Sequence, residues 1–140
     1  MNKSETTTNL ALLRGVIASE TVSRDLPSGS TVAQFDVSTT IRVADKTAKA
    51  SVPVSWVDPP SRALKPIAVG LEVVVVGTVR RRFFRSGGLT QSRTEVVVDA
   101  VVPLRRNKQV QDLLAETVAR VAGFLGAPEV AMEKCLPTNE

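Results

Sequence analysis

The chain has 140 residues, of which 43% are hydrophobic, and it carries a formal charge of +4. This length is sufficient for one domain with a modest core, and no apolar run approaches the ~20 residues that a membrane helix requires. The chain has no histidine and a single cysteine, Cys135, which excludes an intrachain disulfide, a histidine-ligated zinc site and a nucleophile activated by histidine. We therefore expect a binding protein rather than an enzyme, without a metal or a cofactor.

The first ten residues, MNKSETTTNL, lack the apolar core of a signal peptide. A solitary cysteine also suits a reducing compartment. These two observations predict a cytoplasmic protein that does not associate with membranes.

The N-terminal part of the chain predicts one strand and a turn. Residues 1–8 are polar and are expected to be disordered, and a first strand is expected over 9–18, with a bulge or bend at Gly15. Residues 19–24 continue as a polar segment. A turn follows over 26–29, where proline and glycine occur together.

Two further strands are expected before the middle of the chain. Apolar and polar residues alternate over 31–40, which predicts a second strand with Phe35 on its buried face. Residues 41–46 are interpreted as a loop or a strand end. A third strand is expected over 48–57, and because Pro53 has no N–H to donate, that strand should lie at an edge or carry a bulge.

Trp56 shares one face of the third strand with Val52 and Val54, and this pattern favours a core or interface position. Residues 61–64, which follow a pair of prolines, are expected to form a single helical turn.

The most informative stretch, 70–104, is interpreted as one long hairpin. Its first arm begins with four valines at 73–76, a run typical of a strand that is buried on both faces. It continues as RRRFFR at 80–85, and so many arginines cannot be buried without partners. Ser86-Gly87-Gly88 permits a tight turn, and the second arm returns to valine at 96–98.

The basic charge is concentrated on this hairpin. From Gly77 to Lys108, eight Lys or Arg residues stand against Glu95 and Asp99, a local balance of +6 that leaves −2 for the rest of the chain. A local basic patch is expected of a protein that binds a polyanion. The alternative is that exposed arginines only keep a strand edge soluble.

Residues 107–125 differ from the rest, because their apolar residues recur at helical spacing. Asn107 is expected to cap the N-terminus of this helix, and the Gly-Ala-Pro sequence at 126–128 to end it. The apolar stripe requires a partner, which is either the chain's own barrel or a sister subunit.

Five strands, with one helical turn between the third and the fourth, predict an all-β protein built on a small closed barrel. This order resembles the OB-fold. Two stretches resemble the bacterial single-stranded DNA-binding protein family, namely LLRGVIASETVSRDLPSGSTVAQFDVSTT, and GLEVVVVGTVRRRFFRSGG followed by TEVVVDAVV. The resemblance, over roughly 9–104, implies a five-stranded OB-fold barrel with a long hairpin between its fourth and fifth strands, to which this chain adds a C-terminal amphipathic helix.

The chain is thereby divided into four parts, which are a disordered N-terminus (1–8), an OB-fold domain (9–106), a C-terminal helix (107–126) and a flexible tail (127–140). The resemblance further implies sequence-independent binding of single-stranded DNA in replication, recombination or repair, by a homotetramer or a dimer. Where the family has two further aromatic residues, this chain has Val43 and Ala50, and the family's acidic tail has no match at 134–140.

Six residues are the candidates for contact with nucleic acid: Trp56, Arg80, Arg82, Phe84, Arg85 and Arg93. Trp56 and Phe84 fall where the family places stacking aromatics, and stacking on an aromatic ring is worth ~1–3 kcal/mol per base whatever the sequence. The arginines are expected to contact phosphates and so to release counterions. Phe83 has the opposite parity, and either stacking or packing between subunits suits it.

Two alternatives remain open at this point. An OB-fold that has lost some of its aromatics can serve as an interaction or assembly subunit with little affinity for DNA, and it would use the C-terminal helix to contact a protein partner. The same residues also suit an RNA-binding module.

Overall fold

The computed structural model describes residues 7–125. Asn9–Arg105 form one compact unit, which contains the described strands, and Arg106 begins a second unit that contains the C-terminal helix. Between residues 7 and 125, no helix has both the length and the apolar character needed to span a bilayer. The same residues include no group of three or more acidic, cysteine or histidine side chains placed to hold a metal ion.

The first unit is a closed barrel. Its strands are β1 (Ala11–Ile17), β2 (Val22–Asp25), β3 (Thr31–Val43), β4 (Lys46–Val57), β5 (Glu72–Ser86) and β6 (Leu89–Pro103). They pair in the order β1-β5-β6-β4-β3-β2, and β1 also pairs with β3, which closes five of the strands into a ring. All of the pairings are antiparallel except β4 with β6. This is an OB-fold, as the sequence predicted.

Gly15 allows β1 to pair with two different strands. Its first residues pair with β5, and its last two pair with β3. A Cβ atom at Gly15 would collide with the carbonyl oxygen of Ser38 and would lie 2.9 Å from Cγ1 of Val37. The close approach that closes the barrel therefore requires glycine, which confirms the special role predicted for this position.

The barrel interior is aliphatic with two aromatic rings. Val73 to Val76 are all buried, as expected for a strand covered on both faces, and Phe35 is 3% exposed. Trp56 also belongs to this core and is 7% exposed. Pro53 lies beside the only two residues of β4 that pair with β6, so it sits where that edge of β4 becomes free.

Two pairings differ from the expectation. β2 was expected to be an unpaired polar segment, yet it pairs with β3 over Val22–Asp25. Residues 41–46 were expected to be a loop or strand end, but β3 continues to Val43 and β4 begins at Lys46, so only Ala44 and Asp45 make the turn. Both of these turn residues have positive φ, 50° and 70°, as a two-residue hairpin turn requires.

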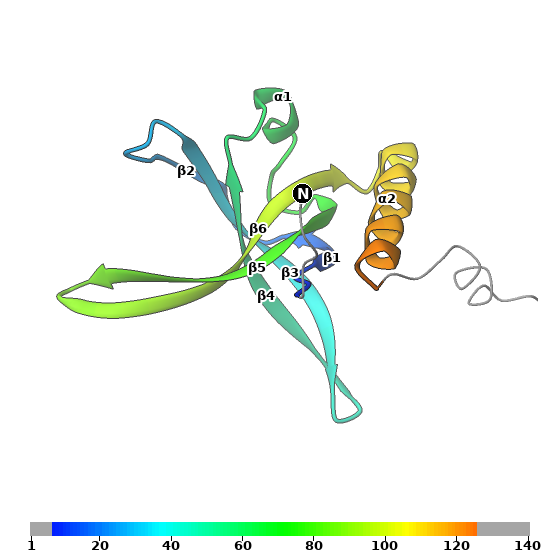
Figure 1. Cartoon of the computed structure of the whole chain (residues 1–140), viewed down its shortest axis with the longest axis horizontal. Coiled ribbons are helices and arrows are strands. Elements are labelled where there is room, and N and C mark those ends of the chain that lie inside the picture. Colours follow the sequence, from blue (N-terminus) through cyan, green and yellow to red (C-terminus); the bar gives the residue numbers. More distant parts are fainter. Residues whose placement is uncertain (1–6, 126–140) are drawn as a thin grey trace, which may run out of the picture. The chain divides into compact units, whose positions relative to one another are not determined.

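Two two-stranded hairpins project from the barrel (Figure 1). The first, here called the arm, comprises residues 78–95 of β5 and β6, and it turns at Gly87 and Gly88 as the sequence predicted. The second, here called the short hairpin, comprises residues 39–50 of β3 and β4. The arm begins just after a register shift at Val76/Gly77, where a Cβ on Gly77 would collide with the carbonyl of Val97.

The two helices lie where the sequence predicted them. α1 (Ser61–Leu64) is the expected single turn, and α2 (Asn107–Leu125) is the C-terminal helix. The N-cap prediction was wrong by one residue, because the N–H of Val110 donates to the carbonyl of Arg106 (3.0 Å) and Asn107 is already helical. The predictions of a disordered start, a helix stop at 126–128 and a flexible tail concern residues 1–6 and 126–140, which lie outside the described residues.

Candidate nucleic-acid interface

The register of the arm assigns its side chains to two faces. Arg80 lies opposite Glu95, Arg82 opposite Arg93, and Phe84 opposite Gln91. Residues directly opposite each other in an antiparallel pair point to the same side. These six form the anchored face of the arm, and Arg81, Phe83, Arg85, Thr90, Ser92 and Thr94 form the open face.

The anchored face is organised by Glu95, whose side chain is fully buried. Its Oε2 accepts hydrogen bonds from Nε and Nη2 of Arg80 and from Nε of Arg82 (3.1 Å). Its Oε1 accepts a hydrogen bond from Oγ of Ser55 on β4 (2.8 Å). Both carboxylate oxygens are thus occupied, as a buried charge requires.

The environment of Glu95 contains two opposing effects on its pKa. Burial raises the pKa, whereas the hydrogen bonds from Arg80, Arg82 and Ser55 and the charge of Arg82 lower it. The second effect is larger, and the pKa falls from 4.5 to about 2. Glu95 is therefore ionised at neutral pH, and it neutralises part of the arginine charge at the base of the arm.

Arg82 and Arg93 face each other across the two strands. Like charges in this position repel. The guanidinium of Arg82 lies 5.4 Å from the centre of the Phe84 ring, and Arg93 is 4.0 Å from a carboxylate oxygen of Asp36. Two opposed arginines beside a partly buried ring form an arrangement that suits a phosphate group and a base.

The open face presents the more accessible ring. Phe83 is 64% exposed, and the guanidinium of Arg81 lies 5.6 Å from its centre. Arg81 also donates to Oγ of Ser92 (3.3 Å), and Arg85 donates to the carbonyl of Gly88 (3.4 Å). The sequence left Phe83 undecided because its parity is opposite to that of Phe84, and its exposure now makes it a candidate for contact with a base.

The six predicted contact residues divide into two groups. Arg80, Arg82, Phe84 and Arg93 come together on the anchored face, and Arg85 lies on the open face near the turn. Trp56 lies among the residues of the barrel core. Its predicted contact with a base remains untested, and its 7% exposure favours the core alternative that the sequence also allowed.

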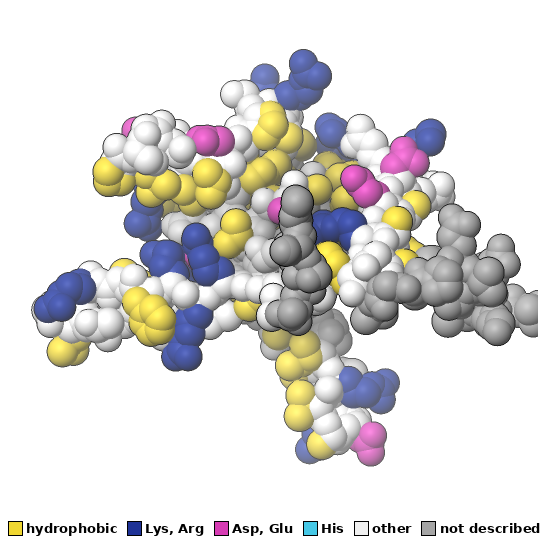
Figure 2. Space-filling view, in the orientation of Figure 1, with side chains coloured by type: hydrophobic (Ala, Val, Ile, Leu, Met, Phe, Trp, Pro, Cys, Tyr) yellow, Lys and Arg dark blue, Asp and Glu magenta, His cyan; other side chains and the backbone are white. Residues whose placement is uncertain are grey.

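Space-filling colours distinguish the two hairpins (Figure 2). Lys and Arg side chains occupy much of the arm, and hydrophobic side chains follow the short hairpin to a tip that carries both signs of charge. Two of the hydrophobic residues on the short hairpin are Ile41 (43% exposed) and Val43 (59% exposed). The arm carries five arginines, and the short hairpin carries Arg42 and two lysines.

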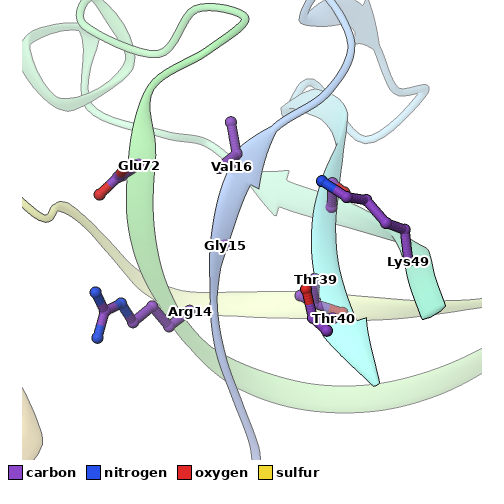
Figure 3. A pocket seen from close by; sticks show the side chains of 8 residues that line it. Arg14, Gly15, Val16, Thr39, Thr40, Lys49 and Glu72 are labelled. Atoms are coloured by element: carbon purple, nitrogen blue, oxygen red, sulfur yellow. The ribbon is translucent and has the colours of Figure 1, made fainter. Parts of the chain in front are cut away.

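A hollow of about 470 Å³ lies on the barrel surface around Gly15 (Figure 3). Arg14 and Glu72 lie on one side of β1, and Thr39, Thr40 and Lys49 lie on the other. The hollow therefore has two cations, one acid and a row of hydroxyl groups from β3. It adds a weakly basic surface to the strongly basic arm.

Comparison with known proteins supports the fold. No protein-family model matches the sequence, and no curated protein matches it. Among solved structures, the chain is similar to the SSB of Plasmodium falciparum, determined as a complex with single-stranded DNA, with a TM-score of 0.59. The similarity covers 73% of this chain and 96% of that chain at 23% sequence identity. It confirms an OB-fold like that of an SSB, and membership of the bacterial family stays a prediction.

Proposed function

We propose that this chain binds single-stranded DNA without sequence preference and acts in replication, recombination or repair. The observation that carries the proposal is the arm, where two phenylalanines are adjacent in sequence and lie among five arginines outside the barrel. The ring of Phe83 is already 64% exposed, so a base can stack on it without rearrangement of the core. The similarity to an SSB that was determined with single-stranded DNA supports the same ligand.

The proposed mechanism combines stacking with phosphate contacts. Every base has a flat π-face, so an aromatic platform accepts any sequence. The arginines on both faces of the arm contact phosphates and release counterions, which makes binding sensitive to salt. Duplex DNA binds more weakly, because its paired and stacked bases do not offer their faces to Phe83 and Phe84.

We further propose that the protein is a cytoplasmic homo-oligomer, a tetramer or a dimer, and not an enzyme. Leu12 and Val16 on β1 are 51% and 38% exposed, and they are two residues of the kind that an interface between subunits would cover. Light scattering of the purified chain measures its mass. A monomer at micromolar concentration would contradict the proposed oligomer.

Fluorescence anisotropy of a labelled oligo-dT tests the proposed function. We expect saturable binding that weakens steeply with salt, with a duplex of the same length as a control that binds more weakly. An oligo-U strand tests the RNA alternative, and tighter binding to oligo-U than to oligo-dT would favour it.

A second candidate function, as an assembly subunit, is favoured by α2. Four of its apolar residues are between 36% and 46% exposed: Leu114, Val118, Val121 and Phe124. If protein contact is the main activity, deletion of 107–140 abolishes that activity and leaves any binding of DNA unchanged. If DNA binding by the arm is the main activity, the deleted chain retains it.

A further inference from the structure

We infer that Glu95 is a positioning residue, which holds Arg80 and Arg82 in the orientation in which they meet phosphate. This inference rests on the proposed function. It is unexpected on charge alone, because Glu95 places a negative charge inside a surface that is proposed to bind a polyanion. A purely electrostatic account predicts that DNA would bind more tightly without it.

The first step of the argument is the burial of Glu95. A carboxylate that served only to balance charge would lie in solvent, whereas this side chain is fully buried and both of its oxygens accept hydrogen bonds. By contrast, the arginines that it binds are partly open, since Arg80 is 47% exposed and Arg82 is 31% exposed along their side chains. The carboxylate thus lies beneath the two guanidinium groups, which keep accessible N–H groups on the outside.

The second step concerns how the arm is attached to the barrel. Before Val96, β6 pairs only with β5, and a two-stranded ribbon is marginally stable by itself. Ser55 lies on β4, so its hydrogen bond to Glu95 joins the side chains of the arm to the barrel wall. Ser55 also accepts a hydrogen bond from Nε2 of Gln34 on β3 (3.3 Å), which extends the connection to a third strand.

A separate contact fixes only the backbone. The side-chain amide of Asn9 donates to the carbonyl of Val79 (2.7 Å) and accepts from its N–H (2.9 Å). This contact holds the start of the arm but touches no arginine. Among the described residues, the orientation of Arg80 and Arg82 therefore depends on Glu95.

The third step is the position of Arg82 opposite Arg93. Their mutual repulsion would turn Arg82 away from the anchored face if nothing held it there. Its Nε is bound by Glu95, which leaves the two terminal amino groups of the guanidinium close to the Phe84 ring. In this orientation, a phosphate between Arg82 and Arg93 and a base near Phe84 are met at the same time.

The test compares variants that remove one negative charge at different places. Glu95→Gln keeps the shape of the side chain, and Glu20→Gln removes an exposed carboxylate far from the arm in sequence. We expect Glu95→Gln to weaken binding of labelled oligo-dT at least about fivefold at 100 mM salt, and Glu20→Gln to leave it unchanged or slightly tighter. Equal or tighter binding by Glu95→Gln would overturn the inference.

A double-mutant cycle separates positioning from a general structural role. Arg80→Gln with Arg82→Gln keeps donors for the buried carboxylate but removes both charges from the DNA-binding surface. In that background we expect Glu95→Gln to change the affinity less than about twofold, since there are no arginines left to orient. An undiminished loss in that background would overturn the inference.

Two further measurements cover the remaining outcomes. If Glu95→Gln does not fold, Ser55→Ala removes only the hydrogen bond to Oε1, and a two- to threefold weakening of binding is expected, on the order of one lost hydrogen bond. If the unaltered protein binds no oligo-dT, the proposed function fails by itself. NMR of the arginine Nε–H groups then tests positioning without DNA: slowly exchanging signals of Arg80 and Arg82 that vanish in Glu95→Gln support it, and their absence from the unaltered protein overturns it.

Discussion

The arm and the short hairpin share a backbone design and differ in their side chains. Each is an antiparallel ribbon that leaves the same barrel and turns through two residues with positive φ, at Gly87-Gly88 and at Ala44-Asp45. The arm carries two phenylalanines and a charge balance of +4, whereas the short hairpin has no aromatic residue and a balance of +2. The comparison teaches that the OB-fold supplies two possible surfaces, and that only side-chain chemistry identifies one of them as a site for bases.

The hairpins also differ in how they are attached. The arm has a buried carboxylate at its base that binds two arginines and a serine of the neighbouring strand. At the base of the short hairpin, among the described residues, the cross-strand side-chain bond is a weak one from Thr39 to the carbonyl of Ala50 (3.4 Å). The four predictions below set one hairpin against the other or test what anchors the arm.

The largest difference is expected when the apolar residues of each hairpin are truncated. Phe83→Ala with Phe84→Ala should remove about 2–6 kcal/mol of stacking, which is a loss in affinity for oligo-dT of at least about 30-fold. Ile41→Ala with Val43→Ala is the matched control on the short hairpin and should change the affinity less than about twofold. Similar losses from both pairs, measured by anisotropy, would refute the distinction between the hairpins.

The second prediction concerns the attachment of the arm and its dependence on pH. The folded pKa of Glu95, about 2, lies below its ordinary value of 4.5, so the ionised carboxylate stabilises the fold above pH 4.5 and this contribution is lost as the pH falls toward 2. The shift corresponds to roughly 3 kcal/mol. Denaturant unfolding at pH 7, 4 and 2.5 should show the advantage of the unaltered chain over Glu95→Gln shrinking with acid. A constant advantage would contradict this assignment.

The third prediction concerns charge. Arg81→Ala with Arg85→Ala removes two proposed phosphate contacts from the open face and should reduce the slope of log affinity against log salt by about 1.4, at about 0.7 for each contact on a single strand. Arg42→Ala with Lys46→Ala removes the same charge from the short hairpin and should reduce the slope by less than about half of that amount. The idea fails if the short-hairpin pair has the larger effect.

The smallest effects are expected at the two turns. Gly87 has a φ of 62° and open space around its missing Cβ, so Gly87→Ala should lower the free energy of unfolding by about 1 kcal/mol through backbone strain alone. Ala44 has a φ of 50°, so Ala44→Gly relieves a similar strain and should leave that free energy unchanged or raise it by up to about 1 kcal/mol. Thermal unfolding of both variants distinguishes these outcomes, and equal destabilisation would contradict the turn geometry.

The buried elements were predictable from sequence because their signal is local. The valine run at 73–76, the alternation around Phe35 and the helical spacing over 107–125 each specify one element, and the structure contains all of them. β2 was missed because it is polar and fully exposed, so only its pairing with β3 defines it. The turn of the short hairpin was missed because Ala44 and Asp45 lack the glycine that usually marks such a turn.

The site was only partly predictable because its organisation depends on register. The sequence identified Arg80, Arg82 and Phe84 as neighbours on one face, and the structure places them together. Glu95 appeared in the sequence only as an acid to be subtracted from a basic stretch. Its role emerges when β6 is aligned against β5 and beside Ser55, which is 40 residues earlier in the chain. For Trp56, the alternation with Val52 and Val54 was the better guide to its burial.

The most direct test of the central claim is photocrosslinking of an oligonucleotide that contains 5-iododeoxyuridine. Cleavage after glutamate separates the two hairpins cleanly, because residues 21–72 contain the short hairpin and residues 73–95 contain the arm. Mass spectrometry of the digest should find the crosslinked base in the 73–95 peptide, at Phe83 or Phe84. Crosslinks confined to the 21–72 peptide would contradict the account and place the DNA on the short hairpin or the barrel wall.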